Sequence, residues 1–168
     1  KIGAFGGSLR KASANLGLLR AAVEMGTEGA EITLIDISEL PLYNGDIEAA
    51  GPPESVTKFW EALKACNAFL IATPEFNFGM AANVKNAIDW ASRCSDKPLA
   101  GRPLGIMSAG GGHGGLRAQM SVRQTMVFLD MHVLNSPDVA VRIFSGKKFD
   151  DSGNLIDDGE KKKVAAML

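Results

Sequence analysis

The sequence predicts an α/β protein in which one parallel sheet carries helices on both faces, giving three layers. Short apolar runs alternate along the chain with segments of helical periodicity, which is typical of a doubly wound sheet. Right-handed crossovers between parallel strands place helices on both sides of such a sheet. A length of 168 residues without an internal repeat or low-complexity tract predicts a single domain over residues 1–168.

Five strands are expected in the sheet. The second, EITLIDI, alternates its apolar residues, whereas the third, AFLIAT, is almost entirely apolar, as a strand covered on both faces should be. Pro137 lies within the fifth strand and cannot donate to a central ladder, so an interruption at 135–137 is expected. The five expected ranges are 1–5, 31–37, 68–73, 103–108 and 132–143.

The intervening segments carry the periodicity of helices that lie on a sheet. Residues 56–63 and 84–91 each place apolar side chains at i, i+3, i+4 and i+7. Further helices are expected over 16–27 and 116–129. Residues 145–159 are polar and contain glycine, so they are expected to form an exposed loop before a last helix.

The composition excludes several classes of function. A net charge of −1 gives no basic field for holding nucleic acid. No apolar run approaches the roughly 20 residues of a membrane span, so no membrane partner is expected. Cys66 and Cys94 lie far apart and outside any C-x-x-C or His/Cys cluster. This spacing indicates reduced cysteines in a cytoplasmic protein, with neither a disulfide framework nor a metal site.

The first unusual loop, GGSLRKASAN, follows the first strand. Backbone amides at a helix start lack intrahelical partners and carry positive partial charge, which suits a phosphate group. Ser8, Arg10, Ser13 and Asn15 add side-chain donors, and the loop contains no acidic residue. A helix cap would explain Ser13 or Asn15 but not four donors together. The loop therefore predicts a phosphate site, although it matches neither a P-loop nor a G-x-G-x-x-G motif.

The second loop, TPEFNFGM, places two aromatic residues just past the third strand. Phe76 and Phe78 could belong to the core, but core aromatics rarely lie in a loop beside Pro, Glu, Asn and Gly. The functional interpretation makes them apolar walls for a planar ring. Asn77 and backbone groups would then meet the polar edge of that ring.

The third loop, SAGGGHGG, contains five glycines in eight residues. Glycine lets the backbone approach a ligand closely. A flexible linker is the alternative, but it would have little purpose between a strand and its crossover helix. Backbone amides of this loop are expected to hydrogen-bond one edge of a heterocycle.

The three loops are expected to converge, because ligands in such a sheet bind beyond the carboxyl ends of the strands. Phosphate donors, an aromatic wall and a glycine edge together describe a site for a phosphorylated planar cofactor. FMN has one terminal phosphate and a flat three-ring head, and it fits this description.

These motifs resemble those of the NADPH-dependent FMN reductase family, and most closely its quinone reductases. The family's phosphate signature, G-S-x-R-x-x-S-x-N, is matched over residues 7–15. Its second signature, P-E-Y-N followed by K-N-A-I-D-W, is matched by 74–77 and 85–90, with Phe76 in the tyrosine position. A serine followed by glycines is matched over 108–115. The chain departs from the family in reading MAANV where Pro-Gly often precedes K-N-A-I-D-W.

The resemblance implies a flavodoxin-like fold and an enzyme that binds FMN. It implies a ping-pong cycle in which NAD(P)H passes hydride to the flavin and a quinone-like acceptor is then reduced by two electrons. It also implies a homo-oligomer, a dimer or a homotetramer. No catalytic side chain is assigned, because the flavin carries the chemistry. The expected cofactor-binding residues are Ser8, Arg10, Ser13, Asn15, Leu16, Pro74, Glu75, Phe76, Asn77, Phe78, Ser108, Gly110 and Gly111.

Two non-enzymatic alternatives remain open at this point. A flavodoxin-type electron carrier would be strongly acidic and would cover both faces of the flavin, which the charge and the glycine loop argue against. An FMN-binding redox sensor would bind flavin with negligible turnover. Arg117 and Gln119 follow the glycine loop on a helix and could line the entrance of the site, but an exposed helix face is the expectation.

Overall fold

The central sheet has the strand order β2-β1-β3-β6, and both β7 and β8 pair with β6 in parallel orientation. This computed structural model describes residues 1–168. The order is that of a flavodoxin-like sheet, which confirms the expected fold class. The strands are β1 (Ile2–Gly6), β2 (Ile32–Leu34), β3 (Ala68–Ala72), β6 (Pro103–Gly110), β7 (His132–Val133) and β8 (Val139–Arg142).

The sheet contains six strands where five were expected, because the fifth is divided in two. His132 in β7 pairs with Pro103 at the start of β6, and Val139 in β8 pairs with Met107 near its end. The break falls where Pro137 was expected to interrupt the ladder. The expected strand over 31–37 is also too long, since only Ile32–Leu34 pair with β1.

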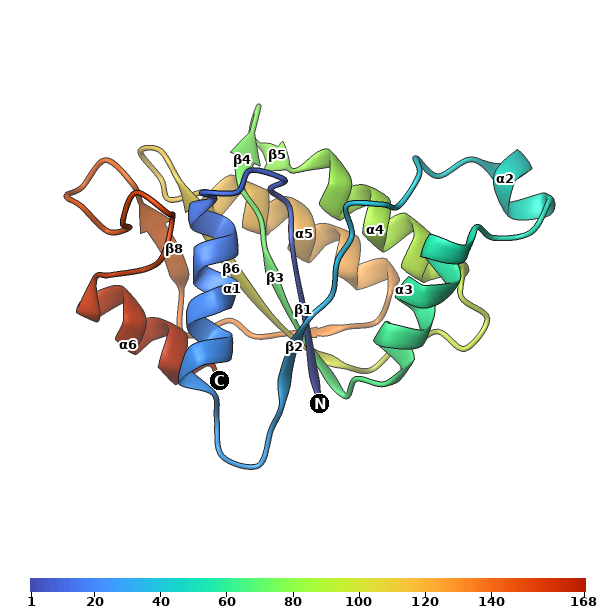
Figure 1. The fold of residues 1–168 in the computed structure, drawn as a ribbon, viewed down its shortest axis with the longest axis horizontal. Helices are drawn as coiled ribbons and strands as arrows, with labels where there is room; N and C mark the ends of the chain where they lie inside the picture. Colours follow the sequence, from blue (N-terminus) through green and yellow to red (C-terminus); the bar gives the residue numbers. More distant parts are fainter.

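Helices cover both faces of the sheet (Figure 1). One face carries α1 (Ala14–Met25) and α6 (Asp158–Met167), and the other carries α3 (Glu54–Lys64), α4 (Ala82–Arg93) and α5 (Leu116–Phe128). Phe69 and Ile71 of β3 pack under α3, α4 and α5, whereas Leu70 and Ala72 pack under α1 and α6. Both faces of β3 are buried, which explains why its sequence is continuously apolar.

Three short elements were not expected from the sequence. These are α2 (Gly45–Ala49) and the antiparallel pair β4 (Glu75–Phe76) and β5 (Gly79–Met80). Asn44 caps α2, where its side-chain oxygen accepts from the Asp46 amide at 2.8 Å. Elements of two to five residues are too short to show a hydrophobic period.

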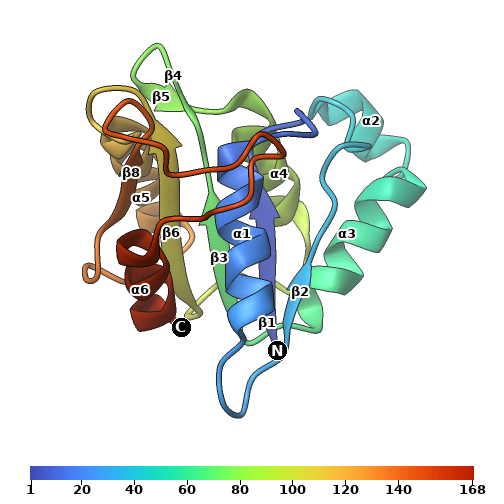
Figure 2. The same cartoon turned by 60° about the vertical axis from the view of Figure 1, so that its left-hand side comes forward.

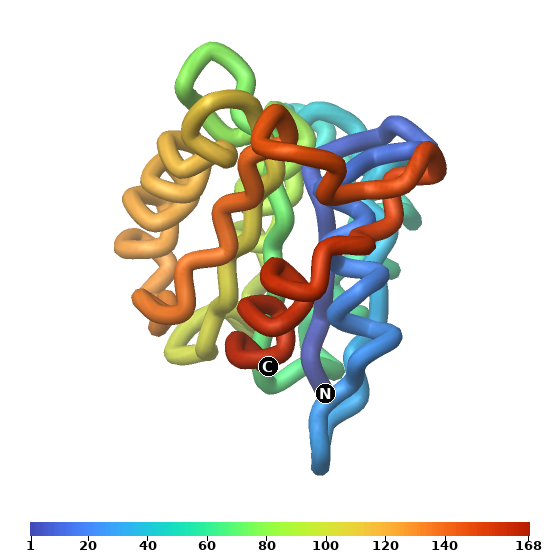
Figure 3. Tube along the Cα trace, turned by 90° about the vertical axis from the view of Figure 1, so that its left-hand side faces the viewer, coloured from blue at the N-terminus to red at the C-terminus, as the bar shows by residue number.

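The segment 145–157 is less exposed than expected, because it crosses the beginning of α1 (Figure 3). Leu155 is buried in the core under α1 and α6. Arg20 Nε donates to Asn154 Oδ1 at 2.9 Å, which ties the segment to α1. A Cβ at Gly153, whose φ is 78°, would lie 2.7 Å from the carbonyl carbon of Ala12. The segment therefore packs directly against the loop that precedes α1.

None of the helices has both the length and the apolar character that a bilayer crossing requires. The three unusual loops, which follow β1, β3 and β6, lie together at the carboxyl edge of the sheet, at the top of Figure 2.

Candidate functional site

Backbone pairing beyond the strand ends brings the three loops together. The Gly7 amide donates to the Ala72 carbonyl at 2.9 Å, and the Thr73 amide donates to Met107 at 3.0 Å. A Cβ at Gly7 would lie 2.7 Å from Val84 in the first turn of α4. Only glycine allows the first loop to approach α4 this closely. The loops after β1, β3 and β6 thus form one continuous rim, as expected.

The loop after β1 presents polar groups that the protein does not use. Five of its backbone amides donate to no acceptor within the chain, namely those of Ser8, Leu9, Lys11, Ala12 and Ser13. The exposed guanidinium of Arg10 forms neither a hydrogen bond nor an ion pair. Unpaired amides ahead of a helix N-terminus, with a free cation among them, form an anion-binding concavity. This donor set fits the terminal phosphate of FMN.

Three of the four side chains expected to bind phosphate already have partners inside the protein. Ser8 Oγ accepts from the Arg10 amide at 3.4 Å. Ser13 Oγ accepts from the Leu16 amide at 3.2 Å, so Ser13 caps α1. Asn15 Nδ2 donates to the Ala109 carbonyl, and the Ala109 amide donates to Asn15 Oδ1, both at 2.9 Å. Asn15 therefore clamps the start of α1 to the end of β6. These side chains fix the shape of the loop, and their direct contact with a cofactor stays a prediction.

The loop after β3 folds as a hairpin with a strained tip. Asn77 and Phe78 have φ values of 49° and 67°, as the two central residues of a type I′ turn require. A phenylalanine in this region of backbone space costs about 1–3 kcal/mol, and such strain concentrates at functional sites. The rings of Phe76 and Phe78 are 62% and 68% exposed, so neither belongs to the core. Their exposure suits the role of apolar walls.

Arg117 connects this hairpin to the start of α5. Its Nε donates to Glu75 Oε1 at 2.7 Å, and its backbone amide donates to Glu75 Oε2 at 3.1 Å. Its guanidinium also lies 3.8 Å from the centre of the Phe78 ring. Arg117 lies on an exposed helix face, as expected, and its side chain also joins the second loop to the third. No spacing in the sequence indicates this contact.

The glycine loop after β6 is supported from below by buried side chains. The Ser108 hydroxyl donates to the Gly114 carbonyl at 2.6 Å and accepts from Gln119 Nε2 at 2.9 Å. Gln119 Nε2 also donates to the Val139 carbonyl at 3.0 Å. Gln119 is only 2% exposed, so its expected place on an exposed face is wrong. The cofactor contact expected of Ser108 stays a prediction, since its hydroxyl is engaged within the loop.

The upper part of the glycine loop leaves its backbone open. The amides of Gly111, Gly112 and His113 donate to no acceptor within the chain. Gly115 has a φ of 86°, and a Cβ there would lie 2.7 Å from the Ser108 Cβ. Glycine is therefore required where the loop turns into α5, and the open amides ahead of it can bind the polar edge of a heterocycle.

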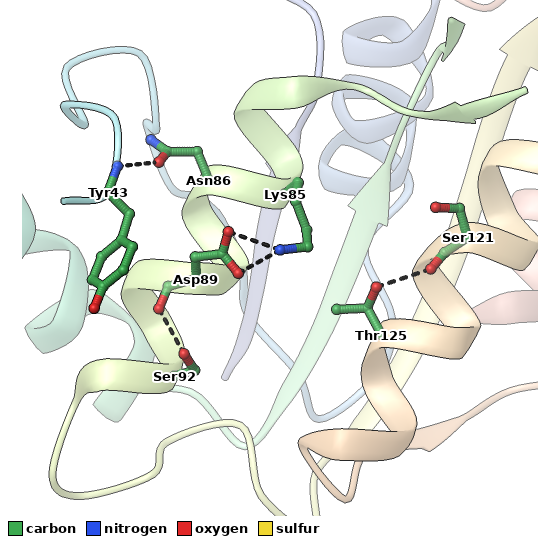
Figure 4. Close-up of polar contacts among 7 residues, drawn as sticks. All are labelled: Tyr43, Lys85, Asn86, Asp89, Ser92, Ser121 and Thr125. Carbon is green, nitrogen blue, oxygen red and sulfur yellow. Dashed lines mark hydrogen bonds and ion pairs between the residues drawn. The ribbon is translucent and has the colours of Figure 1, made fainter. Parts of the chain in front are cut away.

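The K-N-A-I-D-W motif in α4 shapes the scaffold beside the site. The Tyr43 amide donates to Asn86 Oδ1 at 2.8 Å, and Trp90 Nε1 donates to the Pro41 carbonyl at 2.7 Å. Lys85 and Asp89 pair with each other on another side of the same helix (Figure 4). The motif thus fixes the loop that follows β2 and contributes an ion pair to the surface.

Titratable groups outside the loops have structural roles. The Tyr43 hydroxyl donates to Glu48 at 2.7 Å, and this hydrogen bond raises the pKa of Tyr43 above its usual value. Burial raises the pKa of the Cys66 thiol, which keeps it protonated. Cys66 and Cys94 are both free and buried, as expected from their spacing.

Comparison with known proteins connects this site to flavin enzymes. A family model described as NADPH-dependent FMN reductase matches residues 1–146. The NAD(P)H-dependent FMN reductase PA1204 of Pseudomonas aeruginosa is 44% identical over 100% of this chain and 91% of its own length. The NADPH:quinone oxidoreductase of Arabidopsis thaliana is 43% identical over 100% of this chain and 88% of its own length.

A solved structure shows the same arrangement. FerB of Paracoccus denitrificans, described as a flavoenzyme NAD(P)H:(acceptor) oxidoreductase, superposes with a TM-score of 0.84 and 27% sequence identity. The match covers 99% of this chain and 93% of FerB. The superposition therefore spans almost the whole chain.

Proposed function

The chain belongs to the NADPH-dependent FMN reductase family, and on that premise we propose that the carboxyl-edge site carries hydride from NAD(P)H to a quinone-like acceptor. It is an enzyme, an FMN-dependent oxidoreductase that uses NAD(P)H as co-substrate.

The observation that carries the proposal is the unpaired donor set after β1. Five backbone amides and the guanidinium of Arg10 have no partner in the protein. A dianionic phosphate can accept from several of these donors at once, and hydrogen bonds to a charged group contribute more than neutral ones. The donor set therefore anchors the cofactor at the end remote from its ring.

The remaining two loops suit the ring of the cofactor. The free amides of Gly111 and Gly112 would hydrogen-bond its polar edge, and Phe76 and Phe78 would provide apolar walls. Arg117 holds Glu75 and Phe78 in place, which fixes the hairpin after β3 against the glycine loop after β6. Bound FMN supplies the two-electron hydride chemistry, and the chain supplies binding, orientation and polar contacts.

The acceptor is proposed to enter from the open side of the hairpin. Both phenylalanine rings are largely exposed, which leaves apolar surface for a flat, quinone-like molecule. Relatives at 43–45% identity are named NADPH:quinone oxidoreductases, and these names support the assignment. They also argue against a carrier or a sensor without turnover.

We also propose a homo-oligomer built on the outer face of α5. Met120, Val127 and Phe128 are 59%, 80% and 86% exposed on that helix. Met120 and Val127 also line an open hollow, together with Phe78 and four polar or charged residues. Large apolar side chains exposed together on one helix mark interaction sites, and a second copy of the chain would cover Met120, Val127 and Phe128. A dimer or tetramer would place this contact next to the flavin site.

The cytoplasm is the proposed location. Two cysteines that are free and buried suit a reducing compartment.

Two measurements on the purified protein test the proposed function. We expect the absorbance spectrum of a bound flavin, and steady NADPH oxidation that depends on an added quinone. A protein that binds FMN but oxidises NADPH no faster with quinone than without it would contradict the proposed acceptor. A protein that refuses added FMN would contradict the site itself.

A further inference from the structure

A second concave surface adjoins the phosphate loop. A groove of about 360 Å³ is enclosed by β1, the first loop, α1 and the segment that follows β2. Its volume falls within the range of small-molecule sites. The groove is lined by, among others, Ser8, Leu9, Leu16, Leu34, Asp36 and Ser38.

The strand order separates this groove from the expected place of the flavin ring. β2 pairs with one side of β1, and β3 pairs with the other. The walls for the ring come from the loops after β3 and β6. The groove lies over β1 and β2, so a group bound there sits across the phosphate loop from the ring. Ser8 borders both the groove and the phosphate donors, which makes the two surfaces continuous.

The walls of the groove suit a flat apolar group. Leu9 and Leu34 are 66% and 49% exposed, although both are large aliphatic side chains. Leu16 of α1 also lines the groove. These three aliphatic side chains line one slot. An aromatic heterocycle bound in the slot would shield all three side chains from water.

Asp36 places an unpaired carboxylate at the end of this slot. One of its oxygens, Oδ1, accepts from the Ser38 amide at 2.8 Å, which holds the side chain in position. Asp36 is exposed and forms no ion pair, so its second oxygen is free to accept. It lies two residues beyond β2, which pairs with β1. In dinucleotide-binding α/β sheets, an acidic residue at the end of the second strand binds the ribose hydroxyls of adenosine.

We propose that this groove is the subsite for the adenosine end of the hydride donor on the FMN-loaded protein. The adenine lies among Leu9, Leu16 and Leu34, and the ribose hydroxyls donate to Asp36. The inference deepens the proposed function and rests on it, since it concerns the same NAD(P)H. It carries a consequence for specificity, because the carboxylate accepts the 2′-hydroxyl of NADH and repels the 2′-phosphate of NADPH.

The test compares three donors on the FMN-loaded enzyme: NADH, NADPH and reduced nicotinamide mononucleotide, which lacks adenosine. Asp36→Asn keeps an oxygen for the Ser38 amide but removes the charge. We expect KM for NADH to rise about tenfold, as for loss of a charged hydrogen bond, and KM for NADPH to fall. Leu34→Trp fills the groove and should raise KM for both dinucleotides. Oxidation of the mononucleotide should stay unchanged in both variants.

Glu39→Gln is the matched control. It removes the same charge three residues away. Glu39 lines a neighbouring groove that shares Leu34 and Asp36, but it does not line the groove between β1 and α1. Glu39→Gln should not change KM for any of the three donors. If Asp36→Asn and Leu34→Trp leave KM for NADH and NADPH unaffected, or change KM for the mononucleotide by the same factor, the groove is not an adenosine subsite.

Two further outcomes separate this inference from its neighbours. If the variants weaken FAD binding to the apoprotein relative to FMN and leave the donors unchanged, the groove holds the adenylate of a resident cofactor, and the proposal is overturned. If the unmodified enzyme oxidises the mononucleotide but the adenosine adds nothing to kcat/KM, the subsite is overturned while the proposed function stands. If it oxidises no donor at all, the proposed function itself fails.

Discussion

The loop after β1 and the glycine loop after β6 border the same site, but they use their polar groups in opposite ways. In the first, five backbone amides and the guanidinium of Arg10 have no partner in the protein. In the second, Ser108 and Gln119 are buried and engaged with each other and with the backbone. The difference indicates that the unpaired polar groups of the first loop provide affinity for a charged ligand, whereas the paired polar groups of the glycine loop hold the backbone around it. Asn15 joins the two loops through Ala109.

The largest expected loss of stability comes from a substitution in the glycine loop, whose polar groups are paired. Gly115→Val places a branched side chain at a φ of 86° and against Ser108. We expect the free energy of unfolding to fall by about 3 kcal/mol or more, because backbone strain and overpacking add. Urea denaturation of the apoprotein measures it.

Gly112→Ala is the control for that variant. Nothing lies within 4 Å of a Cβ at Gly112, and its φ is not positive. Its stability should change by less than about 0.5 kcal/mol, as at an ordinary surface position. Equal losses in both variants would show that the loop is not held as described.

Asn15→Ala tests the joint between the two loops. The substitution leaves a buried amide and a buried carbonyl of Ala109 unpaired, which costs about 2–3 kcal/mol of unfolding free energy. It should also weaken FMN binding, because the first loop loses its attachment to β6. A loss below about 0.5 kcal/mol would mean that the clamp is dispensable.

The sequence predicted the sheet and the three loops, because hydrophobic periodicity and glycine-rich loops are local signals. Phe69 to Ala72 are apolar since both faces of β3 are covered, and a local pattern records that. The contacts of Asn15 with Ala109 and of Arg117 with Glu75 join residues that are 94 and 42 positions apart. Nothing in the local sequence distinguishes these side chains from ligand donors or from an exposed helix face. Their roles became visible only in the tertiary structure.

A smaller effect is expected at the connection between the hairpin and α5. Arg117→Met keeps the length of the side chain but removes the ion pair with Glu75 and the contact with the Phe78 ring. Because Arg117 is partly exposed, we expect a loss of only about 1 kcal/mol in unfolding free energy. A double-mutant cycle with Glu75→Gln measures the coupling between the two side chains. A coupling near zero would show that the pair does not hold the hairpin.

The smallest effect concerns the segment 145–157, which packs against the first loop. Asp150 accepts from the Asn154 amide and side chain, and these hydrogen bonds lower its pKa. An ion pair with Lys148 lowers the pKa of Asp157. A carboxyl whose pKa is lowered in the folded state stabilises the fold at pH values above its ordinary pKa of about 3.9. This stabilisation is lost as the pH falls through the lowered pKa.

Amide hydrogen exchange between pH 5 and pH 2 would reveal that loss in the segment. We expect protection of residues 150–157, relative to β3, to decrease at the acidic end, and Asp150→Asn to make the decrease shallower. A segment whose relative protection does not change with pH would contradict the assigned role of these carboxylates.

Calorimetry measures whether the unpaired groups after β1 hold the phosphate of FMN. FMN and riboflavin, which lacks the phosphate, are titrated into the unmodified apoprotein and into Arg10→Ala. We expect Arg10→Ala to weaken FMN binding by about 1.5–3 kcal/mol and to leave riboflavin binding unchanged. Equal affinity of the unmodified protein for the two flavins, or an equal loss for both in Arg10→Ala, would contradict the account.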